Sequence, residues 1–253
     1  MIENIQLEAY LAELLTPEKI KDYCPNGLQV EGNKAIKKIV TGVTASQALI
    51  DKAIELNADA ILVHHGYFWK GESEAIKGIK GNRIRSLIKN DINLFAYHLP
   101  LDVHPVYGNN AQLANLLDIS SIEPLEQGNP FSVSLRGELA NQMSAEAFAE
   151  KISKTLNRQC LHLPAGSNKM IKTVAWCTGG GQSYIDLAGE QGIDAFISGE
   201  ASEKTTHSAH ELDIHYFGAG HHATERYGVK SLGEHIAQQF NIDVAFIDIN
   251  NPV

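Results

Sequence analysis

Short apolar runs alternate with longer amphipathic segments along most of the chain, and this alternation predicts the secondary structure. A near-continuous apolar run such as Ala60 to Val63 indicates a strand covered on both faces of a sheet. Segments with apolar residues at helical spacing indicate the helices between such strands. The predicted strands are 36–43, 59–65, 92–98, 131–139, 171–177, 194–198, 214–217 and 244–249. The predicted helices are 1–15, 46–56, 80–90, 109–117, 145–156, 182–191, 201–212 and 229–240.

The order of these elements predicts the fold class. Strands that alternate with helices are typical of an α/β fold with mainly parallel sheets. The pattern also recurs, because the segment 55–60 parallels 190–195 and the segment 92–98 parallels 214–221. The recurrence predicts an internal duplication of a β-α-β-α-β unit. We therefore expect two related α/β subdomains, residues 1–123 and 124–253, whose elements can be interwoven, with a metal site between them.

Composition narrows the function classes. The chain has 253 residues, 43 % of them hydrophobic, and a formal net charge of -9. The acidic balance argues against a general nucleic-acid or membrane-surface binder. Cys24, Cys160 and Cys177 form no C-x-x-C pair, which fits a reducing cytoplasm and argues against a thiolate zinc site. No apolar run approaches the roughly 20 residues that span a bilayer.

Polar side chains follow four predicted strands at the ends where a parallel sheet binds ligands. One strand ends at His64 and His65, and the next at His98, which leads on to Asp102. In the second half, Glu200 follows one strand. His221 and Glu225 follow the next strand, at a tight Gly-Ala-Gly turn into a helix that is expected to begin near His222. Four residues apart on a helix, His221 and Glu225 point the same way. Histidines and carboxylates at corresponding strand ends predict a metal site.

The donor types restrict the metal. Imidazole with carboxylate and without thiolate suits iron, zinc, manganese or nickel. Adjacent histidines at a strand end can reach two ions. The predicted ligands are His64, His65, Asp102, His221 and Glu225. We therefore expect two divalent ions about 3.5–4 Å apart, bridged by one carboxylate. Two such ions against two carboxylates leave a charge of roughly +2, which would attract phosphate.

Several segments together resemble the Nif-three-like family in its short bacterial form. They are Asn26 to Val30, His64-His65-Gly66, His98 to Asp102, Ile197 to Glu200 and Gly220 to Glu225. The resemblance, which runs from about residue 20 to 250, implies the Nif-three-like fold, a ring-shaped homohexamer and a dinuclear metal site facing its interior. It also implies the five ligands above and a GTP cyclohydrolase type 2-like activity. His98 and Glu200 are expected to contact the metal ligands or the substrate rather than a metal ion.

The leading functional hypothesis is a metal-dependent hydrolase acting on a nucleotide or another phosphate-containing substrate. The alternative is a non-catalytic hexameric metal-binding scaffold or metal-trafficking protein. A ring that threads DNA is disfavoured by the acidic balance.

Other features have simpler interpretations. The Gly179-Gly180-Gly181 turn is interpreted as close packing rather than an anion cradle, because it lacks the Walker lysine. The stretch 24–32 is turn-rich, and His162 is placed in a loop. His207, His210 and His215 are interpreted as surface or helix-packing residues. The aromatic residues 67–69 could line a pocket or a subunit contact.

Overall fold

All 253 residues are described by the computed structural model, and they form two compact units. Unit 1 comprises Met1–Gly108 and Arg226–Asn250, and unit 2 comprises Asn109–Glu225 and Asn251–Val253. This division differs from the expected boundary at residues 123 and 124. The chain returns to unit 1 because its last long helix and last strand complete the core and the sheet there.

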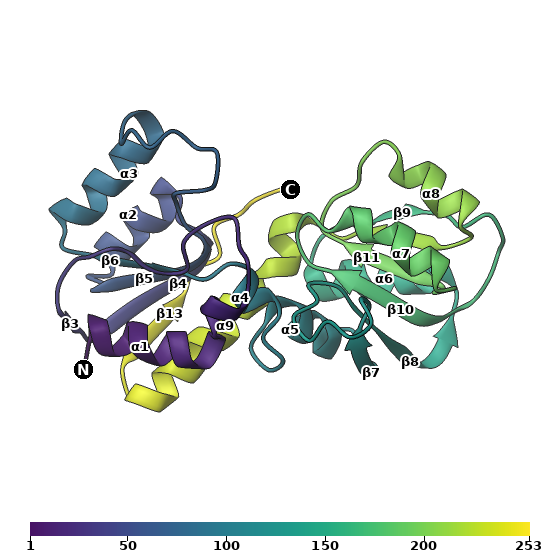
Figure 1. Ribbon diagram of the computed structural model, residues 1–253, viewed down its shortest axis with the longest axis horizontal. Coiled ribbons are helices and arrows are strands. Elements are labelled where there is room, and N and C mark those ends of the chain that lie inside the picture. Colours follow the sequence, from purple (N-terminus) through teal and green to yellow (C-terminus); the bar gives the residue numbers. More distant parts are fainter. The chain divides into compact units, whose positions relative to one another are not determined.

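Unit 1 is built on a five-stranded sheet in the order β13-β4-β5-β6-β2 (Figure 1). All neighbours are parallel except β2, which runs antiparallel to β6. The strands are β2 (Gly27–Val30), β4 (Lys38–Thr44), β5 (Ala60–His65), β6 (Asn93–Ala96) and β13 (Asp243–Phe246). A separate antiparallel pair joins β1 (Ile2–Glu3) to β3 (Ala35–Ile36). The stretch predicted only as turns therefore contains a strand, because β6 supplies the pairing that the local sequence does not announce.

Helices cover both faces of this sheet (Figure 1). The helices of unit 1 are α1 (Asn4–Leu15), α2 (Gln47–Glu55), α3 (Gly78–Lys89), the short α4 (Leu99–Asp102) and most of α9 (His221–Phe240). One core, which includes Ile61 and Val63, packs under α2 and α3. The other core includes Leu62 and packs against α1 and α9. The alternation along β5 follows from the period of two in a strand, so the apolar run serves both faces.

Local signals set several helix ends. The Ser46 hydroxyl accepts a hydrogen bond from the Leu49 amide at the start of α2. The Ser144 hydroxyl does the same for the Ala147 amide at the start of α6 (Ala145–Leu156). Helix α6 ends at Asn157 in the left-handed conformation. These residues satisfy backbone groups that a helix end leaves open, so the sequence predicted α2 to within a residue and α6 at both ends.

Unit 2 contains a six-stranded sheet in the order β7-β8-β10-β11-β12-β9. Its centre is parallel, whereas β7, β8 and β9 are antiparallel to their neighbours. The strands are β7 (Ile119–Pro124), β8 (Leu135–Met143), β9 (Leu161–Leu163), β10 (Ile171–Cys177), β11 (Ala195–Ser198) and β12 (His215–Gly218). The α/β class with mainly parallel sheets is confirmed. The placement of His162 in a loop is wrong, since β9 pairs with β12 at the sheet edge.

Helices also cover the sheet of unit 2. They are α5 (Asn109–Leu116), α6, α7 (Ile185–Glu190), α8 (Thr205–Glu211) and the first turn of α9. Helices α7 and α8 enclose a core with Phe196 and Tyr216. Phe148 of α6 meets Phe217 edge to face, with ring centroids 5.1 Å apart. His215, expected at the surface or in helix packing, is a buried residue of β12 with 3 % of its surface exposed.

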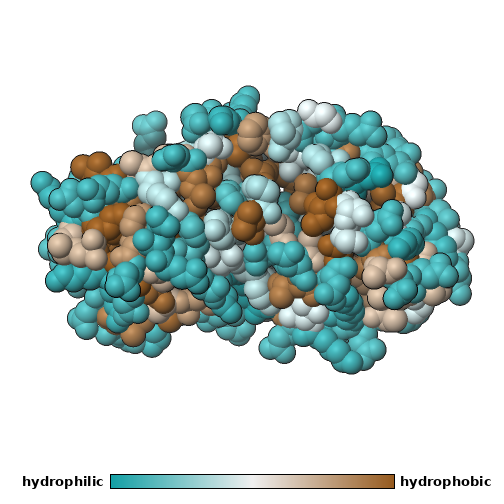
Figure 2. Space-filling view, turned by 90° about the horizontal axis from the view of Figure 1, so that it is seen from below, coloured by the Kyte–Doolittle hydropathy of each residue, from teal (hydrophilic) through white to brown (hydrophobic).

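The mixture of hydrophilic and hydrophobic residues on the surface agrees with a chain in which 43 % of the residues are hydrophobic. Figure 2 shows hydrophilic residues over most of the face that it presents, with hydrophobic residues among them. None of the helices combines the length and the apolar character that crossing a bilayer requires.

Candidate metal centre

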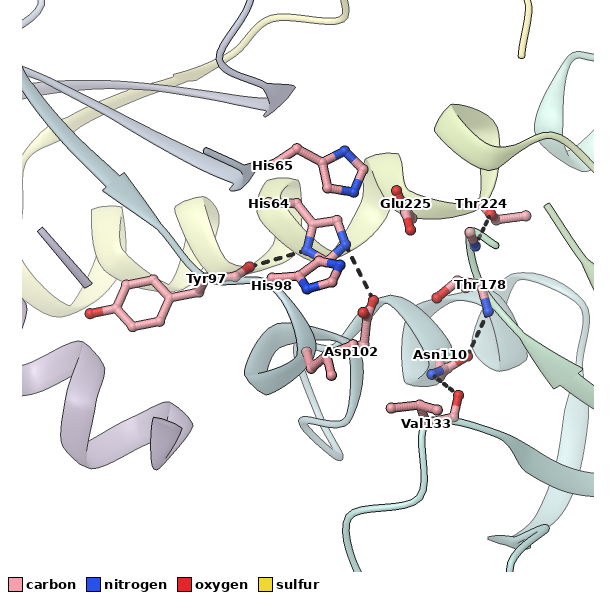
Figure 3. Close-up of polar contacts among 12 residues, drawn as sticks. His64, His65, Tyr97, His98, Asp102, Asn110, Val133, Thr178, Thr224 and Glu225 are labelled. Atoms are coloured by element: carbon pink, nitrogen blue, oxygen red, sulfur yellow. Dashed lines mark hydrogen bonds and ion pairs between the residues drawn. The ribbon is translucent and has the colours of Figure 1, made fainter. Parts of the chain in front are cut away.

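The carboxyl ends of β5 and β6 bring together the predicted site residues of unit 1 (Figure 3). His64 and His65 are the last two residues of β5, and His98 follows β6 immediately before α4. Asp102 is the last residue of α4. The ring centroid of His64 lies 4.5 Å from that of His65 and 5.0 Å from that of His98. One unit thus supplies several imidazoles and a carboxylate to one place.

His64 has a fixed tautomer. Its Nδ1 lies 3.1 Å from the carbonyl oxygen of Tyr97. A carbonyl can only accept, so Nδ1 carries a proton and donates it, which leaves Nε2 to face the other side of the ring. That Nε2 lies 3.5 Å from Oδ1 of Asp102. His64 is fully buried and Asp102 is 6 % exposed, so this imidazole and carboxylate face each other away from bulk water.

His65 is oriented by a neighbouring strand. Its Nδ1 lies 3.2 Å from the hydroxyl of Thr44, the residue opposite it at the end of β4. This contact uses Nδ1 and leaves Nε2 as the ligand atom. Since His65 is only half-buried, its ring lies closer to solvent than that of His64.

His98 is held by the turn-rich segment before β2. Its Nδ1 lies 2.7 Å from Oδ1 of Asp22, and its backbone amide donates to Oδ1 of Asn26 at 2.7 Å. The Asp22 carboxylate also accepts from Asn26 Nδ2 and from the Leu99 amide. Burial alone would raise the pKa of Asp22, but the hydrogen bonds from His98 and Asn26 outweigh burial and lower it. The anionic carboxylate therefore accepts a hydrogen bond from Nδ1 of His98. Nε2 of His98 then lies on the opposite side of the ring from Asp22.

Cys24 lies beside this arrangement. Ligand atoms of Asp22, Cys24 and His98 fall within 4.8 Å of one another. Burial, and then the charge of Asp22, raise the pKa of the Cys24 thiol to about 12. Both oxygens of Asp22 accept hydrogen bonds, from His98, Asn26 and Leu99, so in this structure Asp22 positions the His98 ring.

In unit 2, three predicted residues form one chain of contacts. Oε1 of Glu200 lies 2.6 Å from Nδ1 of His221, and Nε2 of His221 lies 3.2 Å from Oε2 of Glu225. Burial alone would lower the pKa of His221, but the hydrogen bonds and charges of Glu225 and Glu200 raise it to about 9. Helix α9 begins at His221 itself, one residue earlier than expected, which sets the i to i+4 spacing of His221 and Glu225.

The glycine turn packs on this pair. Gly179 has a φ of +64°, and a Cβ there would lie 2.1 Å from Oε1 of Glu225. Its amide donates to the hydroxyl of Thr224, and the amide of Gly181 donates to the hydroxyl of Ser198. Both amides are therefore committed inside the protein. This agrees with the interpretation as close packing and argues against an anion cradle.

Asn110 fixes the strand end before that turn (Figure 3). Its Oδ1 accepts from the Thr178 amide at 3.1 Å, and its Nδ2 donates to the carbonyl of Val133 at 3.0 Å. The backbone carbonyl of Asn110 accepts from Nε1 of the buried Trp176. No local sequence signal identifies Asn110, because all three partners lie more than 20 residues away along the chain.

The structure therefore groups the predicted residues within each unit. His64, His65, His98 and Asp102 come together in unit 1, and Glu200, His221 and Glu225 in unit 2. Sequence reasoning missed Asp22 and Thr44, which orient two of the imidazoles. Asp22 had a weak signal, four residues before Asn26 in the turn-rich stretch, whereas Thr44 had none.

The donor chemistry fits a borderline divalent metal. Unit 1 offers imidazole nitrogens and one carboxylate, and unit 2 offers one imidazole and carboxylates. Each of His64, His98 and His221 has Nδ1 against a carbonyl or carboxylate oxygen, as metal-binding histidines usually do. Iron, zinc, manganese and nickel all accept such a donor set.

Comparisons with known proteins cover the whole chain. A family profile described as Duf34/NIF3 (NGG1p interacting factor 3) matches residues 3–252. Proteins named "GTP cyclohydrolase 1 type 2 homolog" from Vibrio cholerae and Haemophilus influenzae are 62 % and 59 % identical, over 100 % and 99 % of this chain and 100 % of each relative.

Solved structures give the same picture. A structural-genomics protein of unknown function, ybgI, is 51 % identical with a TM-score of 0.96. A protein from Thermus thermophilus is 30 % identical with a TM-score of 0.89. Each similarity covers 100 % of this chain and 100 % of the other.

Proposed function

Because the chain belongs to the Duf34/NIF3 family, we propose that it binds two divalent metal ions and hydrolyses a nucleotide or another phosphate-containing substrate. The proposed ligands are His64, His65, Asp102, His221 and Glu225. The relatives' name, GTP cyclohydrolase 1 type 2 homolog, supports a nucleotide as the substrate class.

One observation carries the proposal: His64 and His221 each have Nδ1 against an oxygen atom and Nε2 against a carboxylate. The carbonyl of Tyr97 takes Nδ1 of His64, and the carboxylate of Glu200 takes Nδ1 of His221. A metal ion held between an imidazole nitrogen and a carboxylate oxygen would take the place of a proton there. Here Nε2 of His64 faces Asp102, and Nε2 of His221 faces Glu225.

The proposal joins the two groups into one dinuclear centre. Its support is the path of the chain, since Glu225 is the last residue of unit 2 in this region and Arg226 of the same helix belongs to unit 1. Glu225 is only 3 % exposed. Glu225 would help to hold the ions together with Asp102, and these two carboxylates would partly neutralise the charge of the ions.

Two divalent ions would supply Lewis acidity and lower the pKa of bound water. The residual positive charge would draw a phosphate group to the centre. The roles of the chain's own residues follow from the contacts described above. Glu200 holds the His221 ring, Tyr97 and Thr44 hold the paired histidines, and the glycine turn keeps side chains away from Glu225.

Elemental analysis of the purified protein tests the centre first. We expect two metal ions per chain in the wild type and fewer in Glu225→Ala. Glu203→Ala is the matched control, because Glu203 is an exposed carboxylate of the same unit. Wild-type protein that takes up no iron, zinc, manganese or nickel would overturn the proposal.

Turnover is tested next, on metal-loaded protein with GTP, other nucleotides and a generic phosphodiester. Hydrolysis above that of His221→Ala supports the hydrolase. Metal bound at the site without turnover of any of these compounds would instead favour the metal-binding scaffold or trafficking protein.

Assembly and location complete the proposal. We propose that the chain assembles into a ring-shaped homohexamer, which sedimentation of the purified protein tests. We also propose that the protein acts in the cytoplasm. A small-molecule ligand fits the net charge of -9 better than nucleic acid does. Binding to DNA at low salt would contradict this part of the proposal.

A further inference from the structure

We infer that Arg226 binds a second phosphate group of the substrate, at a distance from the proposed metal ions, and that the substrate is therefore a nucleoside polyphosphate rather than a monophosphate. The inference rests on the proposed function, because the metal ions have to hold the other end of the same substrate. Arg226 follows the proposed ligand Glu225 in α9, but it belongs to unit 1, as His64 and His65 do. Arg226 would then be a specificity-determining residue of the site.

The sheet of unit 1 directs His64 and Asp248 to the same face. Side chains alternate along a strand, so His64 of β5 points the same way as Leu62, which packs against α1 and α9. Asp248 follows β13, and both of its chain neighbours are isoleucines that pack against the opposite core, under α2 and α3. Asp248 therefore points to the face of α9, where its Oδ2 lies 3.0 Å from Nη1 of Arg226.

The strand register also places these two side chains at the same level of the sheet. On one side, β4 and β5 are paired so that Val43 lies opposite His64. On the other side, Phe246 of β13 pairs with Thr41 of β4. Asp248, two residues further along, therefore reaches the level of Val43. Neighbouring strands lie about 4.8 Å apart, so Asp248 lies roughly 10 Å from His64, a distance that a nucleoside polyphosphate spans and a single phosphate group does not.

Arg226 is oriented before any ligand binds. Besides its contact with Asp248, its Nη2 lies 3.5 Å from the Tyr227 hydroxyl, and its Cζ lies 5.5 Å from the centroid of the Tyr227 ring. The side chains of Arg226 and Asp248 are 18 % and 40 % exposed, so a ligand can reach the pair from solvent. A guanidinium carries five N–H donors, of which a carboxylate engages two in a bidentate pair. A phosphate group can therefore bind Arg226 while Asp248 still orients it.

The charge of the chain favours a dedicated cation for this purpose. A net charge of -9 repels a polyphosphate in general, and the proposed ions offset only the phosphate group that they hold. Arginine matches the geometry of phosphate oxygens better than lysine does. A partly exposed ion pair such as that of Arg226 and Asp248 stabilises a fold only slightly. We therefore expect changes to this pair to affect ligand binding more than stability.

Calorimetric titration of metal-loaded, full-length protein with GMP and with a non-hydrolysable GTP analogue tests this inference without requiring turnover. We expect wild-type protein to bind the GTP analogue about tenfold more tightly than GMP. Arg226→Gln should lower the affinity for the GTP analogue by about tenfold and leave the affinity for GMP unchanged. Arg85→Gln is the matched control, because Arg85 is an exposed arginine of α3, on the other face of the same sheet.

A second variant separates ligand binding from a purely structural role of the ion pair. Asp248→Asn removes a negative charge beside the proposed phosphate position, while the amide oxygen can still accept a hydrogen bond from Arg226. Asp248→Asn should therefore raise the affinity for the GTP analogue severalfold. An ion pair that only ties the chain to α9 predicts instead that Asp248→Asn and Arg226→Gln act in the same direction. A fall in affinity for both variants, together with a fall in melting temperature, would overturn the inference.

The outcomes distinguish this inference from the proposed function. Metal-loaded wild-type protein that binds neither GMP nor the GTP analogue would end the proposed nucleotide substrate as well as the inference. Wild-type protein that binds both nucleotides equally well, with no effect of Arg226→Gln, would overturn only the inference. Equal losses of affinity for both nucleotides in Arg226→Gln would show that Arg226 does not distinguish the second phosphate group, which would also overturn it.

Discussion

The two units contain the same module of three parallel strands. The register of residues that pair across the three strands is also the same in both units. In unit 1, Ala60 of β5 pairs with Ile39 of β4 and Asn93 of β6. In unit 2, Ala195 of β11 pairs with Val174 of β10 and His215 of β12. A helix follows the first and second strands in each module.

Details outside the strands repeat as well. Oδ2 of Asp59 accepts the amides of Lys37 and Lys38, and Oδ2 of Asp194 accepts those of Lys172 and Thr173. After the third strands, the Tyr97 amide donates to the Val63 carbonyl and the Ala219 amide donates to the Ser198 carbonyl. This agreement is compatible with an internal duplication, which remains our prediction.

The modules differ at their carboxyl ends. The middle strand leads to His64 and His65 in unit 1 but to Gly199 and Glu200 at the corresponding place in unit 2. In unit 2 the imidazole comes instead from His221, after the third strand. One framework thus presents an imidazole-rich group in one unit and a carboxylate-rich group in the other. The framework fixes where ligands meet, and single residues fix which ligands they are.

The largest expected effect comes from Gly179, which lies where the other module has Thr44. Gly179→Val adds a side chain at a positive φ and against Glu225, so it should cost about 3 kcal/mol of stability and reduce the metal content. Thermal unfolding and elemental analysis measure both effects. Gly180→Ala is the control, since a Cβ there meets nothing closer than 3.8 Å. An unchanged melting temperature for Gly179→Val would contradict the tight packing of Gly179 against Glu225.

The next largest effects are expected at the first residue of the third strand in each module, Asn93 of β6 and His215 of β12. The Asn93 side chain accepts from Asn4 and Gly32 and donates to the carbonyls of Asn33 and Asp59. Asn93→Ala should therefore lower the free energy of unfolding by about 3 kcal/mol, measured in urea.

His215 is the matched residue in unit 2. Its Nδ1 accepts from the Ala165 amide and its Nε2 donates to the Lys169 carbonyl. With fewer bonds lost, His215→Ala should cost about 2 kcal/mol. A larger loss for His215→Ala than for Asn93→Ala would contradict the idea that hydrogen bonds set the order.

Asp194 gives a smaller, pH-dependent effect. Burial alone would raise its pKa, but the bonds from Thr173 and Lys172 outweigh burial and lower it. A lowered pKa in the folded state means that the ionised carboxylate adds stability above the unfolded pKa and loses it as the pH falls through the folded pKa. Asp194→Asn should cost about 1 to 2 kcal/mol at neutral pH.

Urea unfolding at several pH values checks the sign. The difference between wild type and Asp194→Asn should stay constant from neutral pH to about 4 and shrink below that. A difference that grows on acidification would contradict the lowered pKa.

The smallest expected effect is a difference in metal affinity between variants of two residues that contact the imidazole rings, Glu200 and Thr44. Glu200→Gln should weaken metal binding by about tenfold, because a neutral amide orients His221 less well than a carboxylate does. Thr44→Val removes the hydroxyl beside His65 and should weaken binding less, because that partner is already neutral. Competition with a chelator measures both variants, and equal losses would show that partner charge is not what matters.

Local patterns identified most of the parallel framework. The strand ending at Cys177 and helix α6 were predicted with the observed bounds, because a buried apolar run and a capped amphipathic segment are both local signals. The short edge strands β2, β7 and β9 were missed. Few apolar residues mark them, and the neighbouring strand supplies their hydrogen bonds.

The sequence by itself determined which residues could be ligands and the strand or helix to which each belongs, because a donor at the end of an apolar strand is visible in the order of residues. Only the tertiary structure decided which nitrogen each histidine presents. That choice depends on partners far away in the chain, such as Asp22, 76 residues from His98, and Tyr97, 33 residues from His64. Hydrogen bonds of this range form only when the fold brings strand ends and loops together.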